Sequence, residues 1–511
     1  MARSVFEIVG PIMIGPSSSH TAGMARIGLM AYRVLNMQPQ SMHLDLSPKM
    51  KTTYSGHRSD AALFGGAIGF SESSEELKDV INIVQKMGVK TSVGFLPEGS
   101  PQNTAYLLMT DAEGVSHSIT GTSVGGGSII ISAVDCVKIS LAADEYHIIV
   151  WSKGKLPELE IPNTVKVQSG TREDGITVSS FSSIMKIDET LQKELETLKD
   201  LEKISVVMPV LTYGGTLPQC KKISSCEEVV KIAQESNLTI SEIAIQYEMG
   251  RSGNSEEEIV ELMKKQLKVI KESLKRGQEE NKLLYGLASG KDGAKLMQAV
   301  NNGDTISGGI VPIAVAYALG VMEYNGSMGC IVAAPTAGSS GIVPGSMIAV
   351  QNEFGISDDK ILNALFTASL MGVIIDEKGV SFSGSVGGCQ GEIGVSSAIT
   401  AAGLASVFTT DPVKIVHAMA LCLKNLLGLV CDPIASPIEV PCIKRNAVGV
   451  ANAFISADMA LAGITSFIPP DEVIDALLDV EQRLPTELKS GTIGGLACTK
   501  TAKFVRACLQ Q

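Results

Sequence analysis

The spacing of apolar positions divides the chain into two kinds of segment. Residues 22–35 carry Met, Ile and Leu at helical spacing, whereas the runs at 42–46, 129–131 and 146–151 alternate or are rich in β-branched and aromatic residues, as strands are. From about residue 222 the helical spacing dominates. We therefore predict an α+β protein, in which an N-terminal mixed α/β domain precedes a large, mostly α-helical domain.

Three capping-box patterns mark the beginning of the helical part. In each, the hydroxyl of the N-cap residue can accept a hydrogen bond from the N3 amide, and the N3 carboxylate can accept one from the N-cap amide. The pairs are Ser225 with Glu228, Thr239 with Glu242, and Ser255 with Glu258. After Ser255, one helical stripe contains Ile259, Met263, Leu267, Ile270 and Leu274. We expect Gly277 to end this helix.

Further along, residues 361–375 and 398–408 would be apolar on nearly all sides as helices, which predicts a deeply buried helical core. Gly- and Pro-rich interruptions in that core could hold a cofactor. The expected domains are residues 1–150, a connecting region 151–280 that turns helical near its middle, and residues 281–511. Residues 152–205 show no convincing βαββαβ pattern of a regulatory module.

Charge and apolar length narrow the function classes. The formal net charge is −12 and the pI about 5.2, which argues against nucleic-acid binding. The N-terminus has no apolar run of signal-peptide length, and the most apolar stretch, 308–322, is too short to span a bilayer. We expect a cytoplasmic protein with no membrane partner, whose ten cysteines form no disulfide framework.

Two N-terminal motifs contain candidate site residues. Residues 15–21 read Gly-Pro-Ser-Ser-Ser-His-Thr ahead of a helical pattern, and hydroxyls with amides at a helix start suit an anion, although an ordinary N-cap is the competing interpretation. His57 lies in the polar run Gly-His-Arg-Ser-Asp and is either an acid–base group or a surface histidine. The glycine-rich run 121–128 precedes a strand and lacks the P-loop lysine, so we expect a tight turn or a domain contact there instead of a nucleotide site.

Three cysteines stand at backbone breakers. Cys389 lies in Gly-Gly-Cys-Gln-Gly-Glu, Cys431 precedes Asp-Pro, and Cys442 follows a proline, whereas Cys422 falls inside a helical run and is expected to pack. The spacing matches neither a zinc CxxC pair nor a ferredoxin run. From the residues alone, metal ligation and a structural role both remain open.

Taken together, these motifs resemble the iron–sulfur L-serine dehydratases, which are pyridoxal-phosphate-independent bacterial ammonia-lyases. The matching runs are GPSSSHTAG, the Gly125–Gly127 triplet, APTAGSSGIVPG, GGCQGEIG, and CDPI with PCIKRNA. The resemblance covers most of the chain in the family's order and implies a single chain with fused β-type and α-type domains. It also implies conversion of L-serine to pyruvate and ammonium, and a homodimer.

The resemblance further implies the site. A [4Fe–4S] cluster would be held by Cys389, Cys431 and Cys442, with one iron left open to the substrate hydroxyl as a Lewis acid. His20 and His57 would be the acid–base groups. The substrate carboxylate would be bound by Ser17, Ser18, Ser19, Thr21, Thr336, Gly338 and Ser339.

Three departures from the family pattern concern the substrate and the C-terminus. In the family's usual motif Gly-His-Gly-Thr-Asp, the second glycine is replaced here by Arg58. The usual acid before the first cluster cysteine is replaced by Val386. Some members place a C-terminal cysteine on the open iron, and Cys508 matches that cysteine only loosely. The alternatives are β-elimination from threonine, cysteine or another β-substituted amino acid, and a non-catalytic amino-acid sensor. A zinc hydrolase fits less well, because hydrolytic zinc favours His and carboxylate ligands.

Overall fold

The computed structural model describes residues 2–51, 53–154, 156–157, 159, 161–211, 213–434, 439–489 and 493–509. The chain divides into two compact units. The α/β unit is Ser19–Leu217, and the helical unit is formed by Met1–Ser18 together with Pro218–Gln511. The predicted α+β class is confirmed, with strands concentrated in the first unit and helices in the second.

The α/β unit contains a six-stranded sheet in the order β3-β2-β4-β5-β6-β7. The strands are β2 (Ser41–Leu46), β3 (Lys90–Phe95), β4 (Thr104–Thr110), β5 (Ser116–Gly125), β6 (Ser128–Val134) and β7 (Val137–Ala142). Only β2 and β3 pair in parallel. Helices α1 (Gly23–Leu35) and α2 (Ser59–Ala67) pack together, with α3 (Val80–Lys86) beside α2. The predicted strands at 42–46, 129–131 and 146–151 and the helix at 22–35 are confirmed.

A second, four-stranded antiparallel sheet completes the unit, in the order β11-β8-β10-β9. Its elements are β8 (Tyr146–Lys153), β9 (Lys166–Thr171), β10 (Ile176–Ser183), α4 (Glu189–Glu196) and β11 (Leu201–Val207). Leu191 and Leu195 of α4 pack on Ile148, Val150 and Phe181 of the sheet. The described part of residues 152–205 thus contains the end of β8, then β9, β10, α4 and most of β11.

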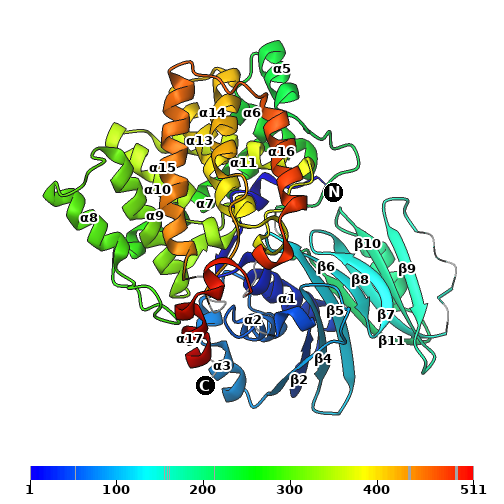
Figure 1. The fold of residues 1–511 in the computed structure, drawn as a ribbon. Helices are drawn as coiled ribbons and strands as arrows, with labels where there is room; N and C mark the ends of the chain where they lie inside the picture. Colours follow the sequence, from blue (N-terminus) through cyan, green and yellow to red (C-terminus); the bar gives the residue numbers. More distant parts are fainter. Residues whose placement is uncertain are drawn as a thin grey trace. The chain divides into compact units, whose positions relative to one another are not determined.

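Helix α13 is the central helix of the helical unit and contacts α10, α11, α14 and α15 (Figure 1). Its helices are α5 (Cys226–Ser236), α6 (Ile240–Ser252), α7 (Glu256–Gly277), α8 (Asp292–Asn302), α9 (Ile310–Gly326), α10 (Ile342–Phe354), α11 (Asp358–Glu377), α12 (Gly384–Gly387), α13 (Val395–Phe408), α14 (Pro412–Leu423), α15 (Cys442–Leu461), α16 (Pro470–Arg483) and α17 (Lys500–Leu509). The N-terminal strand β1 (Ile12–Ile14) pairs antiparallel with β12 (Cys330–Val332). The first residues of the chain are therefore part of this unit.

The helix starts follow the predicted caps with one change. Thr239 and Ser255 form complete capping boxes with Glu242 and Glu258. Ser225 accepts from the Glu228 amide, but the Glu228 carboxylate accepts from the amide of Ser224, one residue before the cap. The acid still satisfies a free amide at the helix start, so this end is stabilised in the same way.

Two predictions about glycines are confirmed, and the structure adds detail to each. The tight turn in the run 121–128 consists of Gly126 and Gly127, because strand β5 continues to Gly125 and β6 begins at Ser128. Helix α7 does end at Gly277, but the next residue is right-handed and no left-handed cap is present. Gly277 instead lies against the backbone of Gly320, where a Cβ would overlap, so close helix packing explains this glycine.

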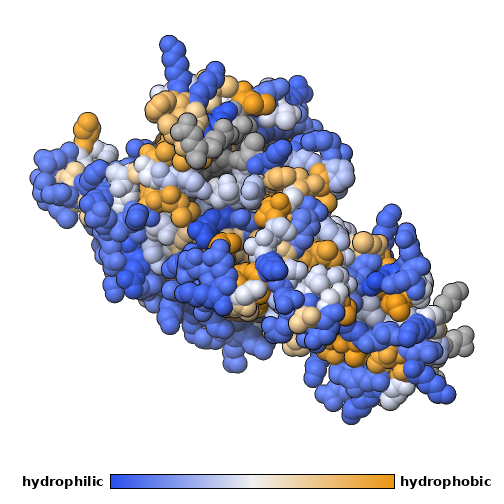
Figure 2. All heavy atoms as spheres, turned by 90° about the horizontal axis from the view of Figure 1, so that it is seen from below, coloured by the Kyte–Doolittle hydropathy of each residue, from blue (hydrophilic) through white to orange (hydrophobic). Residues whose placement is uncertain are grey.

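The apolar helices are core elements. Among the described residues, only Gln390–Phe408 is long and apolar enough to cross a membrane, and 83% of that window is buried inside the protein. Helices α11 and α13 are buried on nearly every face, as the sequence predicted. The face seen in Figure 2 is mostly hydrophilic, with apolar side chains scattered in small groups.

Candidate functional site

Three buried cysteines converge in the helical unit, each at a break in regular structure. Cys389 follows the short helix α12, Cys431 lies in the loop after α14, and Cys442 begins α15. Their exposed fractions are 1%, 6% and 5%. Cys389, Cys431 and Glu392 bring their ligand atoms within 4.8 Å of one another. Sequence reasoning singled out these three cysteines but assigned no role to Glu392, the one charged residue in its motif.

A cation is fixed beside the thiols. Arg445, one turn into α15, donates to the Cys389 Sγ at 3.4 Å and to the carbonyl oxygen of Val430 at 2.7 Å. Its other nitrogen donates to Asp432 at 2.7 Å, and the second oxygen of Asp432 accepts from the Leu496 amide at 2.8 Å. The guanidinium therefore orients Cys389 and the loop that contains Cys431 together.

The turn at Thr336–Ser339 reaches the same place. Thr336 hydrogen-bonds the Glu392 carboxyl, and a Cβ on Gly338 would lie 3.5 Å from it. Asn446 donates to the carbonyl oxygens of both Gly338 and Cys442 at 2.9 Å, which ties this turn to α15. The Ser339 hydroxyl is fully buried and donates to the Ala334 carbonyl oxygen, so it is already used within the turn.

The surroundings of the thiols disfavour several negative charges in one place unless a cation balances them. The pKa of Cys431 is raised well above its ordinary value by its hydrogen bond to Cys389 and by burial. Burial, and then the negative charge of Cys389, raise the pKa of Cys442. Burial raises the pKa of Glu392 to about 7, against the opposing effect of its bond from Thr336.

In the α/β unit, His20 and His57 stack with ring centroids 4.7 Å apart and planes at 20°. The Thr21 hydroxyl donates to the His57 carbonyl oxygen at 2.8 Å, and the His57 Nδ1 lies 3.0 Å from the Thr53 carbonyl oxygen. Burial lowers the pKa of His20 to about 3 and that of His57 to about 4. Both rings are consequently neutral at pH 7, because burial disfavours their protonated forms.

The serine run lies at the start of α1. Ser18 to Ala22 form a π-helical turn that continues into the helix, with Ser18 and Ser19 buried and Ser17 partly buried. The division of the chain into units falls between Ser18 and Ser19, so the motif contributes to both.

Arg58, the departure noted beside His57, occupies a left-handed position with φ of 51° at the start of α2. Glycine adopts this conformation without strain, which gives a physical reason for the glycine usual in the resembled family. The Arg58 side chain donates to the Lys78 carbonyl oxygen at 3.3 Å. Arginine is thus accommodated, at a conformational cost.

The cysteine group fits a metal or cluster in one further respect. A Cβ on Gly384 would lie 2.9 Å from both the Cys431 Sγ and a Glu392 oxygen, so the space between these groups exists only because residue 384 is glycine. Cys422, in contrast, is buried in α14 against the hydroxyl of Ser397, and burial raises its pKa to about 12, as expected of a packing residue.

Three buried cysteines, a carboxylate and a fixed guanidinium lie together in the mostly helical unit. The protein therefore belongs to the class in which a cysteine-rich group could hold a metal. The chain belongs to the serine dehydratase alpha chain family, whose model matches residues 235–497, just over half of the chain.

Individual relatives cover different parts of the chain. The probable L-serine dehydratase alpha chain of Bacillus subtilis is 42% identical over 54% of this chain and 92% of its own length. The L-serine dehydratase of Streptomyces coelicolor is 26% identical over 97% of this chain and 99% of its own length. L-serine dehydratase 2 of Escherichia coli is also 26% identical over 97% of this chain and covers 98% of itself. The similarity therefore extends over both units.

Proposed function

We propose that this protein is an iron–sulfur L-serine ammonia-lyase that converts L-serine to pyruvate and ammonium. The observation that carries the proposal is the convergence of Cys389 and Cys431 with Glu392 in the helical unit, where Cys442 is also buried. Similarity to L-serine dehydratases over 97% of the chain supports the reaction class. We place the enzyme in the cytoplasm, as a homodimer.

In this proposal Cys389, Cys431 and Cys442 hold a [4Fe–4S] cluster. When bound, such a cluster with one iron free of protein thiolate supplies a Lewis acid toward the substrate hydroxyl. Arg445 holds the Cys389 sulfur and compensates part of the negative charge of the thiolates. Gly384 keeps the space beside Cys431 open.

The substrate needs groups for its carboxylate and its ammonium. We assign the carboxylate to Ser17, Ser18, Ser19 and Thr21, with Thr336 and the backbone at Gly338 and Ser339. The hydroxyl of Ser339 is excluded from this task by its bond to Ala334, so this residue contributes its backbone. Glu392 is an acceptor suited to the ammonium group.

His20 and His57 are the proposed acid–base pair. A neutral imidazole removes the α-proton of serine at one ring nitrogen, and the stacked neighbour orients it. Loss of hydroxide from Cβ then gives aminoacrylate, which tautomerises and hydrolyses to pyruvate and ammonium. Two histidines with low pKa values stay neutral at pH 7, as a base requires.

The test is anaerobic purification with counts of iron and acid-labile sulfide, followed by pyruvate release from L-serine before and after exposure to air. We expect about four irons and four sulfides per chain, and activity that decays in air. Protein without iron, or with activity indifferent to oxygen, would remove the proposal.

A substrate panel distinguishes serine from other amino acids. L-threonine, L-cysteine and L-serine are offered to the same anaerobic protein, and the 2-oxo acid product is measured. Serine turnover well above the others supports the assignment. If serine is inert and another amino acid reacts, the cluster chemistry stands and the substrate is wrong. Amino-acid binding that survives Cys431→Ala, without turnover in either protein, would instead indicate a sensor.

A further inference from the structure

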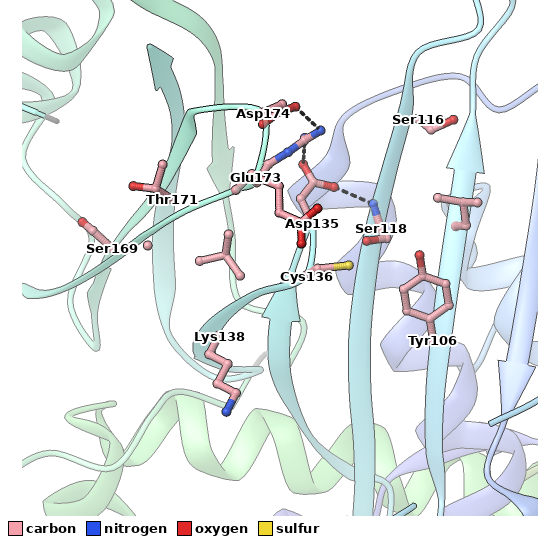
Figure 3. A pocket seen from close by; sticks show the side chains of 14 residues that line it. Tyr106, Ser116, Ser118, Asp135, Cys136, Lys138, Ser169, Thr171, Glu173 and Asp174 are labelled. Atoms are coloured by element: carbon pink, nitrogen blue, oxygen red, sulfur yellow. Dashed lines mark hydrogen bonds and ion pairs between the residues drawn. The ribbon is translucent and has the colours of Figure 1, made fainter. Parts of the chain in front are cut away.

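The two faces of the six-stranded sheet have different neighbours. On one face, Ser116 and Ser118 of β5 line a polar cavity of about 780 Å³ together with Asp135 (Figure 3). On the other face, Gly121 of β5 lies against α1, because a Cβ there would be 3.0 Å from the Ile27 side chain. One histidine of the stacked pair lies in the turn that leads into α1, so the placement of α1 on this face decides where that histidine lies.

Helices α1 and α2 touch through their backbones. A Cβ on Gly28 would overlap the Leu63 carbonyl oxygen, and a Cβ on Gly66 would overlap the Ala25 carbonyl oxygen. Glycine at both positions therefore permits a close approach of the two helices. The two stacked histidines lie just ahead of these helices, one before each, so the contact between the helices also sets the distance between the rings.

A buried cation lies in the first turn of α1. Arg26 is 1% exposed, and its Nε and Nη2 both donate to one oxygen of the Glu72 carboxylate, at 2.9 and 2.7 Å. Its Nη1 donates to the carbonyl oxygen of Gly127 at 2.7 Å. One guanidinium therefore joins α1, the segment after α2 and the glycine turn between β5 and β6.

The position of Arg26 is an unfavourable one for a cation. The first turn is the positive end of the helix dipole, and a buried guanidinium loses its hydration. A buried ion pair adds little stability compared with apolar side chains of similar size. Its directional hydrogen bonds, however, fix one arrangement of the segments that they join. The geometry imposed by the pair of Arg26 and Glu72 therefore explains it better than its contribution to stability does.

We propose that Arg26 is a positioning residue for the stacked pair of His20 and His57. At the start of the two helices, the Thr21 hydroxyl donates to the His57 carbonyl oxygen at 2.8 Å. Arg26 supplies a second tie, between α1 and the segment that follows α2, and so prevents the helices from shifting along each other. Such a shift would change the overlap of the rings, whose centroids are 4.7 Å apart. The effect on catalysis rests on the function proposed above, whereas the effect on the rings does not.

The rings can be observed directly by NMR, because the chain has only six histidines. The full-length protein is prepared with isotope-labelled histidine, and the Cε1–H signals of the pair are assigned with His20→Asn and His57→Asn. Spectra are taken at about pH 8, where an ordinary histidine is neutral too. Stacked rings shield each other, so both signals should lie upfield of the signal of His43, whose side chain is 42% exposed.

The decisive variant removes both charges together. Arg26→Met combined with Glu72→Leu leaves no unpaired charge in the interior, so the fold and Tm should be retained. We expect the signals of both stacked rings to move toward that of His43, and kcat for serine to fall about tenfold at an unchanged KM. Arg26→Lys should give an intermediate result, because an ammonium can pair with Glu72 but lacks the planar fork that also reaches Gly127.

Arg33→Met is the matched control on the same helix. Arg33 donates to the carbonyl oxygens of Met208 and Pro209 at 2.9 and 2.6 Å, near the other end of α1. This variant should leave the ring signals and kcat unchanged.

The proposal is overturned if the folded double variant keeps the wild-type ring signals, or if Arg33→Met moves them as far. It is also overturned if the double variant keeps the wild-type kcat while the wild-type protein turns over serine. A wild-type protein without serine turnover would remove the function proposed above, and the ring signals alone would then decide the role of Arg26.

Discussion

The cysteine group of the helical unit and the histidine pair of the α/β unit both consist of titratable side chains removed from water, but they are built in opposite ways. In the cysteine group, Asp432 fixes the guanidinium of Arg445 beside thiols and a carboxyl group that can become negatively charged. The histidine pair is held by ring stacking and a backbone carbonyl, and burial keeps it neutral. The first arrangement suits the retention of a charged group, and the second suits the exchange of a proton.

The largest effect is expected from removing a thiol. Cys431→Ser should lose bound iron and at least about a thousandfold in activity, because metal binding depends on the complete ligand set. Iron content and pyruvate release are measured together under anaerobic conditions. Cys422→Ser is the matched control, since Cys422 is also buried but lies in α14 against Ser397. Equal iron in the two variants would contradict the assignment of Cys431.

The histidine pair should behave differently. His57→Asn and His20→Asn should each lower kcat by about 10²–10⁴, the usual range for a general base, while the iron content stays at the wild-type value. His43→Asn serves as control, because His43 is in the same unit, 42% exposed and bound to Ser92. Loss of iron in the His57 variant would remove the distinction between the two groups.

A smaller effect is expected from filling the space at the cysteine group. Gly384→Ala adds a Cβ that would lie 2.9 Å from the Cys431 Sγ, so iron retention should fall about tenfold, as for other disturbances around metal ligands. Loss is measured as the rate of iron release to a chelator. Gly250→Ala on α6 is the control, because a Cβ there meets nothing within 4 Å. Similar release rates from both variants would show that the space is unimportant.

The smallest effect concerns pH and stability. The pKa values of about 3 and 4 at His20 and His57 lie below the value of 6.5 for an unfolded histidine, so the unfolded chain binds more protons between these limits. The part of the stability that depends on these two histidines is therefore complete above pH 6.5 and declines as the pH falls toward 5. We expect a loss of about 2–4 °C in Tm over that interval. His57→Asn should reduce this slope and His43→Asn should leave it unchanged; identical slopes in all three proteins would contradict it.

Sequence patterns predicted well what depends on neighbours along the chain. The stripe from Ile259 to Leu274 and the boxes at Thr239 and Ser255 are local, and they are found as expected. The three breaker cysteines could be selected because an interruption in a helical core is visible in sequence.

What could not be predicted depends on contacts between distant residues. Glu392 approaches Cys431 only through the packing of η6 (Gln390–Gly394) near the loop after α14. The use of the Ser339 hydroxyl within its own turn, and of Gly277 against Gly320, likewise depends on tertiary contacts with no local pattern. The roles of His20 and His57 stay predictions, which the variants above will test.

The first residues of the chain belong to the helical unit, where β1 pairs with β12, Ser4 hydrogen-bonds Glu248 at 2.9 Å, and Arg3 pairs with Asp376 at 2.8 Å. During synthesis these residues leave the ribosome well before their partners, which emerge hundreds of residues later. The intervening segment Ser19–Leu217 is continuous and can fold meanwhile. Closing the helical unit around so long a loop is the slow, high-contact-order event, and it is completed only after most of the chain has been made.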